Sequence, residues 1–218
     1  MNNNMVDSID RLRVSIVMPA YNAAPFLRQA VDSILSQTFT DFEFIVVDDG
    51  STDSTLAILD GYSDPRIRVI KSEHNLGLPG ALNLGLSAAR GEYIARMDAD
   101  DVSLPERLMK QVSWLDENPE TSVLGTFSIR IDPQGRYHEF IPVPTGDKEI
   151  SRRLLSDANP IIHGSVMMRS VVVQKVGGYR DIFPMQRTMI SGYELWMLEL
   201  SEIFPIPYIF TVLIQVKR

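Results

Sequence analysis

The sequence contains no cysteine in its 218 residues. This absence excludes disulfide bridges, cysteine-ligated zinc, iron–sulfur clusters and thiol nucleophiles, and it fits a reducing compartment. Basic residues are also few, with 21 Lys and Arg against 28 Asp and Glu, which gives a formal net charge of −7. Nucleic-acid binding depends largely on neutralising phosphates with cations, so we do not expect it here. Any phosphate binding should be local, through a metal ion or backbone amides.

Long apolar runs are absent as well. The polar residues 1–13 hold no stretch that could serve as a signal peptide. The most apolar tract, residues 203–216, is interrupted by Pro205 and Pro207 and is shorter than the ~20 residues of a membrane span. We interpret it as a buried or edge strand and expect a cytoplasmic protein, with peripheral membrane contact left open.

What the sequence does contain is an alternation of strands and helices. Short β-rich runs at 14–18, 43–47, 67–70 and 92–96 are separated by helical patterns at 26–35, 55–62 and 79–91, and Pro105 opens another helix. Such alternation predicts an α/β fold with a mostly parallel sheet. The second half is more mixed, with an expected hairpin (122–131 and 136–141), helices at 147–156, 170–176 and 193–201, and a strand at 164–169.

Polar segments follow three of the predicted strands, at 19–22, 48–51 and 98–101. In parallel sheets, ligands bind beyond the carboxyl ends of the strands, so these segments should meet on one rim. The acidic residues Asp98, Asp100 and Asp101 would repel one another unless they are solvated, cap a helix or bind a cation. The alternative is a solvated loop in which Asp101 or Ser103 caps the next helix, and Asp48–Asp49 likewise suits an ordinary turn.

Taken together, these segments resemble glycosyltransferase family 2. The resemblance rests on 14–22, 33–38, 46–53 and 97–101, with weaker likeness at 163–169 and 176–180. It implies an inverting enzyme with the α/β, Rossmann-like GT-A fold, whose mostly parallel central sheet is flanked by helices and joined to a smaller mixed half. We expect one domain over 1–218, with a donor half at about 14–110, an acceptor half at about 111–218, and truncation at the C-terminus left open.

The resemblance also assigns a nucleotide-sugar donor site. The first loop would lie against the base and ribose, Asp49 would accept a hydrogen bond from the base, typically uracil, and Asp98 would lie near the ribose. Asp100 would coordinate Mn²⁺ or Mg²⁺ at the diphosphate, since these ions prefer hard oxygen ligands. The expected donor residues are therefore Pro19, Ala20, Tyr21, Asn22, Asp49, Gly77, Asp98 and Asp100. Leu82 stands where the family often has an arginine before Asn83.

Two residues match the acceptor or diphosphate side. His163 could touch the sugar or the diphosphate, although a lone histidine is more often structural. Trp196 could stack on an acceptor sugar, although helix packing is the commoner role for such a residue. Inversion also needs a base, usually an aspartate of an acidic pair, but Ser191 and Gly192 occupy that place.

Glu194 and Asp181 are the remaining candidates for the base. In a helix, Glu194 would point roughly 200° away from the expected slot. The resemblance thus implies a glycosyltransferase that moves a sugar from a nucleotide-sugar donor, typically UDP-linked, to a glycan or lipid-linked acceptor. The alternative is a catalytically silent nucleotide-sugar-binding module. A nucleotidyltransferase is disfavoured, because 19–22 is not a Gly-rich basic loop.

Overall fold

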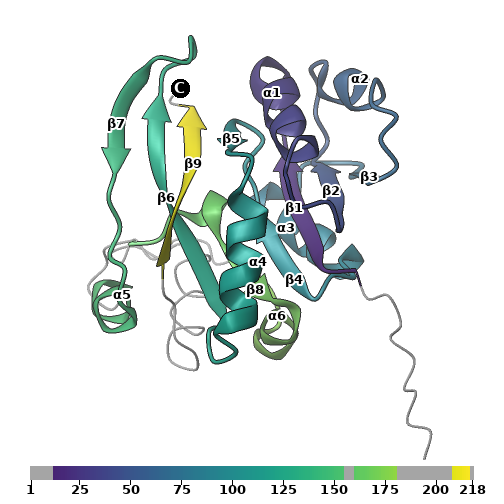
Figure 1. The fold of residues 1–218 in the computed structure, drawn as a ribbon. Coiled ribbons are helices and arrows are strands. Elements are labelled where there is room, and N and C mark those ends of the chain that lie inside the picture. The colour runs from purple at the N-terminus through teal and green to yellow at the C-terminus, as the bar shows by residue number, and fades with distance from the viewer. Residues whose placement is uncertain (1–11, 155–159, 181–207, 217–218) are drawn as a thin grey trace, which may run out of the picture.

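A computed structural model describes residues 12–154, 160–180 and 208–216 (Figure 1). The first half alternates strand and helix as predicted. Its elements are β1 (Val14–Ala20), α1 (Ala24–Leu35), β2 (Phe42–Asp48), α2 (Thr55–Leu59), β3 (Ile67–Lys71), α3 (Gly77–Ala88) and β4 (Tyr93–Arg96).

The second half mixes short strands and helices. Its elements are β5 (Asp101–Ser103), α4 (Arg107–Glu117), β6 (Val123–Ile131), β7 (Tyr137–Ile141), α5 (Asp147–Leu154), the 3₁₀ helix η1 (His163–Ser165), β8 (Met167–Arg169), α6 (Ser170–Val176) and β9 (Tyr208–Val216). The predicted hairpin is confirmed as the antiparallel pair β6–β7. The helix predicted at 193–201 lies outside the described residues. Nowhere in the described ranges does a helix have the length and hydropathy to cross a membrane.

The strands form one sheet in the order β3-β2-β1-β4-β8-β6-β9-β5, with β7 paired to β6. Strands β1 to β4 run parallel, whereas β8 is antiparallel to both β4 and β6. This arrangement confirms the predicted α/β fold with a parallel half and a mixed half. The described part of the apolar tract, residues 208–216, forms β9, which pairs with β6 on one side and β5 on the other, so it is an interior strand.

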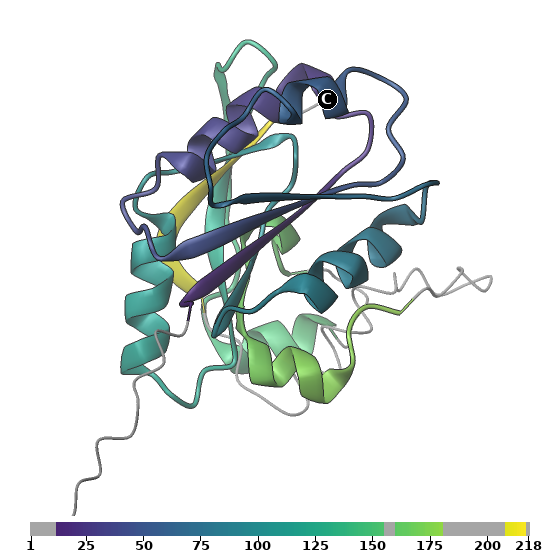
Figure 2. The same cartoon turned by 90° about the vertical axis from the view of Figure 1, so that its right-hand side faces the viewer.

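Helices cover both faces of the parallel half (Figures 1 and 2). Alternation along β1 explains the two layers, because successive strand side chains point to opposite faces. Ile16 and Met18 pack with residues of α1 and α4, such as Leu27 and Leu108. Val17 faces the other layer. Both faces of β1 are therefore buried, and the loops at its carboxyl end remain available for a ligand.

Helix α3 differs from its predicted bounds of 79–91, since it begins at Gly77 and ends at Ala88. Pro79 falls in the first turn, where a helix needs no amide donor, so it does not have to be the first residue. Gly91 does not cap the helix. It lies against the β1 backbone, where a Cβ atom would collide with Ser15 and Val14.

Candidate active site

A pocket of about 230 Å³ opens at the carboxyl ends of β1, β2 and β4. Three loops and the start of α3 form its walls, as expected for a parallel sheet. The lining residues are Pro19, Ala20, Tyr21, Ala23, Asp49, Asn75, Gly77, Leu78, Ala81, Asp98, Ala99 and Asp100. The structure therefore brings together every predicted donor residue except Asn22.

Asn22 instead ties the first loop to the second. Its backbone adopts a positive φ of 49°, a conformation that asparagine tolerates better than most residues. Its Oδ1 accepts hydrogen bonds from the backbone amides of Thr52 at 2.8 Å and Asp53 at 3.3 Å. Its own amide donates to the Ser51 hydroxyl. The placement supports the shape of the loop, and direct contact of Asn22 with a donor stays a prediction.

Asp49 lies at the end of β2 and is 3% exposed. Its Oδ1 accepts a hydrogen bond from the Leu76 amide at 2.8 Å, and its own amide donates to the Ala20 carbonyl at 2.8 Å. The carboxylate is thus fixed between the loop after β3 and the loop after β1. Gly50, with φ of 71°, allows that approach, because a Cβ there would lie 2.9 Å from the His74 carbonyl carbon.

The acidic segment after β4 divides into two half-buried members and one buried member. Asp98 and Asp100 line the pocket, and the Asp98 carboxylate forms an ion pair with Arg96. Asp101 is 4% exposed and begins β5, and burial, with the nearby charges of Asp98 and Asp100, raises its pKa to about 8. The prediction that Asp101 or Ser103 caps the next helix is wrong, because Glu106 occupies the N-cap of α4.

Two buried arginines lie beneath this segment. The Arg96 side chain is 3% exposed and pairs with Asp98. Arg107 is 0% exposed and donates from Nη2 to the Arg96 carbonyl at 2.7 Å and from Nε to Gln111 at 3.1 Å. Burial lowers the pKa of Arg107 to about 10, which still leaves it charged at neutral pH. The two cations offset part of the acidic charge at the pocket.

His163 lies in η1, next to this charged cluster but outside the pocket lining. Its Nε2 is 2.9 Å from the Tyr179 hydroxyl, and the two rings meet edge-on at 5.5 Å. Burial, helped by the charge of Arg96, holds the pKa of His163 well below its usual value. The ring is therefore neutral at pH 7. Asn83 bonds the Tyr179 backbone through both its amide nitrogen and its oxygen, at 2.8 Å each.

The residues at the pocket could hold a divalent metal whose remaining ligands come from a substrate. Among the described residues, no group of three or more His, Asp or Glu side chains could hold a metal by itself. Mg²⁺-type sites often use one or two carboxylates and complete their coordination with phosphates and water. Asp100 supplies such a carboxylate at the pocket, and Asp98 lies beside it.

Several predicted residues fall elsewhere. Both candidate bases, Glu194 and Asp181, and the candidate stacking residue Trp196 lie outside the described residues. Leu82 is 2% exposed in the core, so it does not take over the phosphate contact of the arginine it replaces.

The family model described as "Glycosyl transferase family 2" matches residues 15–177. The chain belongs to glycosyltransferase family 2. Among curated proteins, it is 35% identical over 199 residues to EpsE of Bacillus subtilis, covering 88% of this chain and 68% of that protein. It is 33% identical to an uncharacterized glycosyltransferase of Haemophilus influenzae, covering 84% of this chain and 58% of that protein.

Solved structures of glycosyltransferases share the fold of this family 2 chain. Staphylococcus aureus TarS in complex with UDP-GlcNAc superposes with a TM-score of 0.73 at 22% identity, covering 94% of this chain and 59% of the other. The Pyrobaculum calidifontis mannosyltransferase PcManGT in complex with GDP-Man and Mn²⁺ gives 0.69 at 21% identity, covering 95% and 57%. This chain thus spans about three fifths of those two structures.

The site also contains residues that sequence reasoning did not single out. Arg107 lies in an amphipathic helix and looks like one of its surface cations. Tyr179 becomes a partner of His163 only through the fold, and Gly164 gains importance only from the side chains packed against it. The lining residues Asn75 and Leu78 carry no motif of their own.

Proposed function

We propose that this chain is the catalytic domain of an inverting, metal-dependent glycosyltransferase that uses a UDP-linked nucleotide-sugar donor and a glycan or lipid-linked acceptor. The observation that carries the proposal is the pocket where the loops after β1, β2 and β4 converge. Apolar walls and a few fixed carboxylates are what a nucleoside with donor groups on its base and ribose requires. The proposed setting is the cytoplasm, with peripheral membrane contact where the acceptor is lipid-linked.

The size of the pocket suits part of the donor. Its volume of about 230 Å³ lies below the roughly 300–1,000 Å³ of sites that enclose a drug-sized ligand. The nucleoside would fill it, and the diphosphate and sugar would extend past Asp98 and Asp100 onto the open rim. The acceptor would then approach from the mixed half of the sheet.

The hydrogen bonding of the Asp49 carboxylate favours uracil over guanine as the base of the donor. Its Oδ1 is already bonded to the Leu76 amide, so the other oxygen is the main acceptor left for a base. Uracil presents one N–H donor at N3, whereas guanine presents two adjacent donors that suit both oxygens of a free carboxylate. Glycosyltransferases of this fold bind either base, since TarS was solved with UDP-GlcNAc and PcManGT with GDP-Man.

In the proposed reaction, the acceptor hydroxyl attacks the anomeric carbon and the nucleoside diphosphate departs. A divalent ion held by Asp100 would act as a Lewis acid that stabilises the charge of the leaving diphosphate. Asp49 binds the base and Asp98 the ribose, which orients the anomeric carbon toward the acceptor. His163 is a poor candidate for the base, since its lowered pKa and its hydrogen bond to Tyr179 leave it a weak proton acceptor.

Asp181 and Glu194 remain the proposed sources of the base. Asp181 follows closely after Tyr179, whose backbone Asn83 anchors to α3.

The direct test is calorimetric titration of UDP with and without Mn²⁺. We expect binding that strengthens with Mn²⁺, and an Asp100→Ala variant should lose the Mn²⁺-dependent part. Asp60→Ala is the matched control, since Asp60 is exposed and does not line the pocket. Absence of binding at millimolar UDP would refute the proposal.

A second measurement separates transfer from silent binding. Incubation with a panel of UDP-, GDP- and dTDP-sugars, first by thermal shift and then by product analysis, should give one preferred donor, because a ligand that binds only the folded state raises Tm. Hydrolysis or transfer that disappears in Asp100→Ala supports an enzyme. Tight donor binding with no turnover on any acceptor supports the silent module.

A further inference from the structure

Arg96 is a buried cation aimed at one residue of the pocket. It ends β4, and its side chain is 3% exposed, while the side chain of its partner Asp98 is 31% exposed. The backbone of Arg96 is held on both sides, since its amide donates to the Val166 carbonyl at 2.9 Å and its carbonyl accepts from Arg107 at 2.7 Å. The guanidinium therefore approaches the Asp98 carboxylate from inside the protein.

The contacts of Arg96 differ from those of a structural arginine. Arg169 donates to the carbonyls of Thr121 and Leu115, as buried arginines usually do when they stabilise loops. Arg96, by contrast, has Nε buried without a hydrogen-bond acceptor in the described part of the chain, and its ion pair there is with Asp98. Burying a charge with so few hydrogen-bond partners is unfavourable unless carboxylates compensate it, and Asp98 and Asp101 are the nearby carboxylates that interact with Arg96.

Gly164 packs against the same oxygen of that carboxylate. A Cβ atom on Gly164 would lie 2.7 Å from Asp98 Oδ2, 2.8 Å from Asp101 Oδ2 and 3.1 Å from Arg96 Nη1. The backbone of η1 thus packs directly on the ion pair. Asp98 is confined by Arg96 and by Gly164, and its accessible part faces the pocket.

We propose that Arg96 is a positioning residue that fixes the Asp98 carboxylate so that it selects ribose over deoxyribose in the donor. Arg96 and Gly164 hold Oδ2 on the buried side, and Oδ1 accepts a hydrogen bond from a ribose hydroxyl. Arg96 itself does not touch the nucleotide. This inference rests on the proposed function, since it needs a ribonucleotide in this pocket.

The expected preference for ribose over deoxyribose can be estimated from the hydrogen bond that Asp98 would accept. A hydrogen bond from a neutral hydroxyl to a fixed carboxylate is worth about tenfold to a hundredfold in affinity. A carboxylate free to rotate would first have to be ordered by the ligand, which removes much of that gain. Selectivity should therefore depend on Arg96 even though overall binding also uses the base and the diphosphate.

The test compares UDP with 2′-deoxy-UDP and 3′-deoxy-UDP by calorimetry, in the native protein and in Arg96→Met and Arg96→Lys. The native protein should bind UDP about tenfold more tightly than one of the deoxy analogues. Arg96→Met should reduce that ratio to about threefold or less, and Arg96→Lys should restore part of it, because lysine keeps the charge but loses the planar fork. The reduction should be absent when Asp98→Ala is already present, since Arg96 acts through Asp98.

Gly164→Ala is a second variant that perturbs the Asp98 carboxylate, and it does so without removing a charge. The added methyl group should displace the Asp98 carboxylate and lower the ribose-to-deoxyribose ratio in the same way as Arg96→Met. Gly146→Ala is its control, because nothing lies within 4 Å of a Cβ there. If Arg96→Met fails to fold, the ratio of UDP to deoxy-UDP affinity in Gly164→Ala still tests the proposal.

The outcomes separate this inference from the function on which it rests. If native protein binds UDP but does not distinguish the deoxy analogues, or if Arg96→Met and Gly164→Ala keep the native ratio, the role of Arg96 is refuted and the donor site stands. If native protein binds no UDP, both proposals fail. A loss of selectivity in both variants, with Gly146→Ala unchanged, supports the inference.

Discussion

Gly50 offers a sharp test of how the pocket is built. It follows Asp49 with φ of 71°, and a Cβ atom there would lie 2.9 Å from the His74 carbonyl carbon and 3.0 Å from the Asn75 nitrogen. These are backbone atoms of the loop that lines the pocket and bonds Asp49. Gly50→Ala should therefore destabilise the fold and distort the site together.

The expected magnitude has two parts. An alanine at positive φ costs about 1–2 kcal/mol. Displacing closely packed backbone adds about 1–3 kcal/mol, as overpacking does in protein cores. Gly50→Ala should thus lower the free energy of unfolding by about 2–5 kcal/mol. UDP affinity should fall about tenfold, since the Leu76 amide that orients Asp49 moves with the loop.

Gly135→Ala is the matched control. Gly135 also has positive φ, 78°, but nothing lies within 4 Å of its Cβ position. This variant should lose only the backbone part, about 1–2 kcal/mol, and should keep UDP affinity. Urea denaturation and UDP calorimetry measure both effects. If Gly50→Ala is no less stable than Gly135→Ala, or binds UDP as well, the close approach of the two loops does not shape the site.

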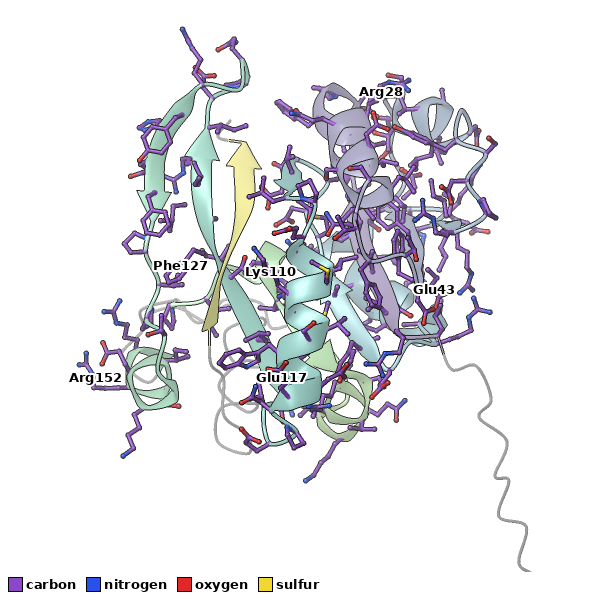
Figure 3. All side chains as sticks on the ribbon, in the orientation of Figure 1. Arg28, Glu43, Lys110, Glu117, Phe127 and Arg152 are labelled. Atoms are coloured by element: carbon purple, nitrogen blue, oxygen red, sulfur yellow. The ribbon has the colours of Figure 1, made fainter. Side chains whose placement is uncertain are left out.

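Three further predictions concern charge and anchoring. Burial alone would raise the pKa of Glu43, but hydrogen bonds from Arg90, Ser15 and Arg68 lower it to about 2 (Figure 3). The ionised Glu43 carboxylate contributes about 2 kcal/mol to the free energy of unfolding, after allowance for its solvent-exposed arginine partners. This contribution is present above pH 4.5 and is lost as the pH falls toward 2. Glu43→Gln should therefore destabilise the protein at pH 7 and much less at pH 2.5, as measured by urea titration. Asp49→Asn should weaken UDP binding at least about tenfold in calorimetry without much loss of stability, because the amide oxygen still accepts from Leu76 while the NH₂ group faces the N3 donor of uracil. Asn83→Ala should cost about 1–3 kcal/mol in thermal unfolding, since it removes the two hydrogen bonds that the Asn83 side chain makes to the Tyr179 backbone.

Each of these three predictions has an outcome that would contradict it. Glu149→Gln is the control for Glu43, because its pKa is lowered to about 2 as well, but by arginines on an exposed helix face. A pH-independent effect of Glu43→Gln would contradict the ion-pair explanation. Unchanged UDP affinity in Asp49→Asn would remove Asp49 from base recognition. An Asn83→Ala variant as stable as the native protein would show that the Tyr179 backbone finds other partners.

Local periodicity was enough to predict much of the fold. The strand and helix pattern of the first half places β1 to β4 and α1 to α4 within a few residues of their observed bounds, because burial on both faces leaves continuous apolar runs and helices leave a 3.6-residue repeat. Helix ends were less predictable. At α3, the first turn accommodates Pro79, and Gly91 serves the packing of β1 instead of ending the helix.

The sequence also determined which segments meet. Because parallel strands share a carboxyl rim, Pro19, Asp49 and Asp98 could be placed in one site before any coordinates, and the pocket contains all three. The roles assigned to them by family resemblance remain predictions. The base could not be placed, since Asp181 and Glu194 fall in a part of the chain that the structure does not describe.

Only the tertiary structure decided how the acidic segment is held. Asp98, Asp100 and Asp101 are equivalent in a sequence, yet the first two face the pocket and the third is buried at the start of β5. The antiparallel strand β8 between β4 and β6 brings η1, with Gly164, against Arg96 and Asp98. Contacts between residues so far apart leave no local periodicity, because they depend on which strands become neighbours. The motifs of the sequence therefore determine which segments form this rim, whereas tertiary packing determines how the side chains of the rim are held.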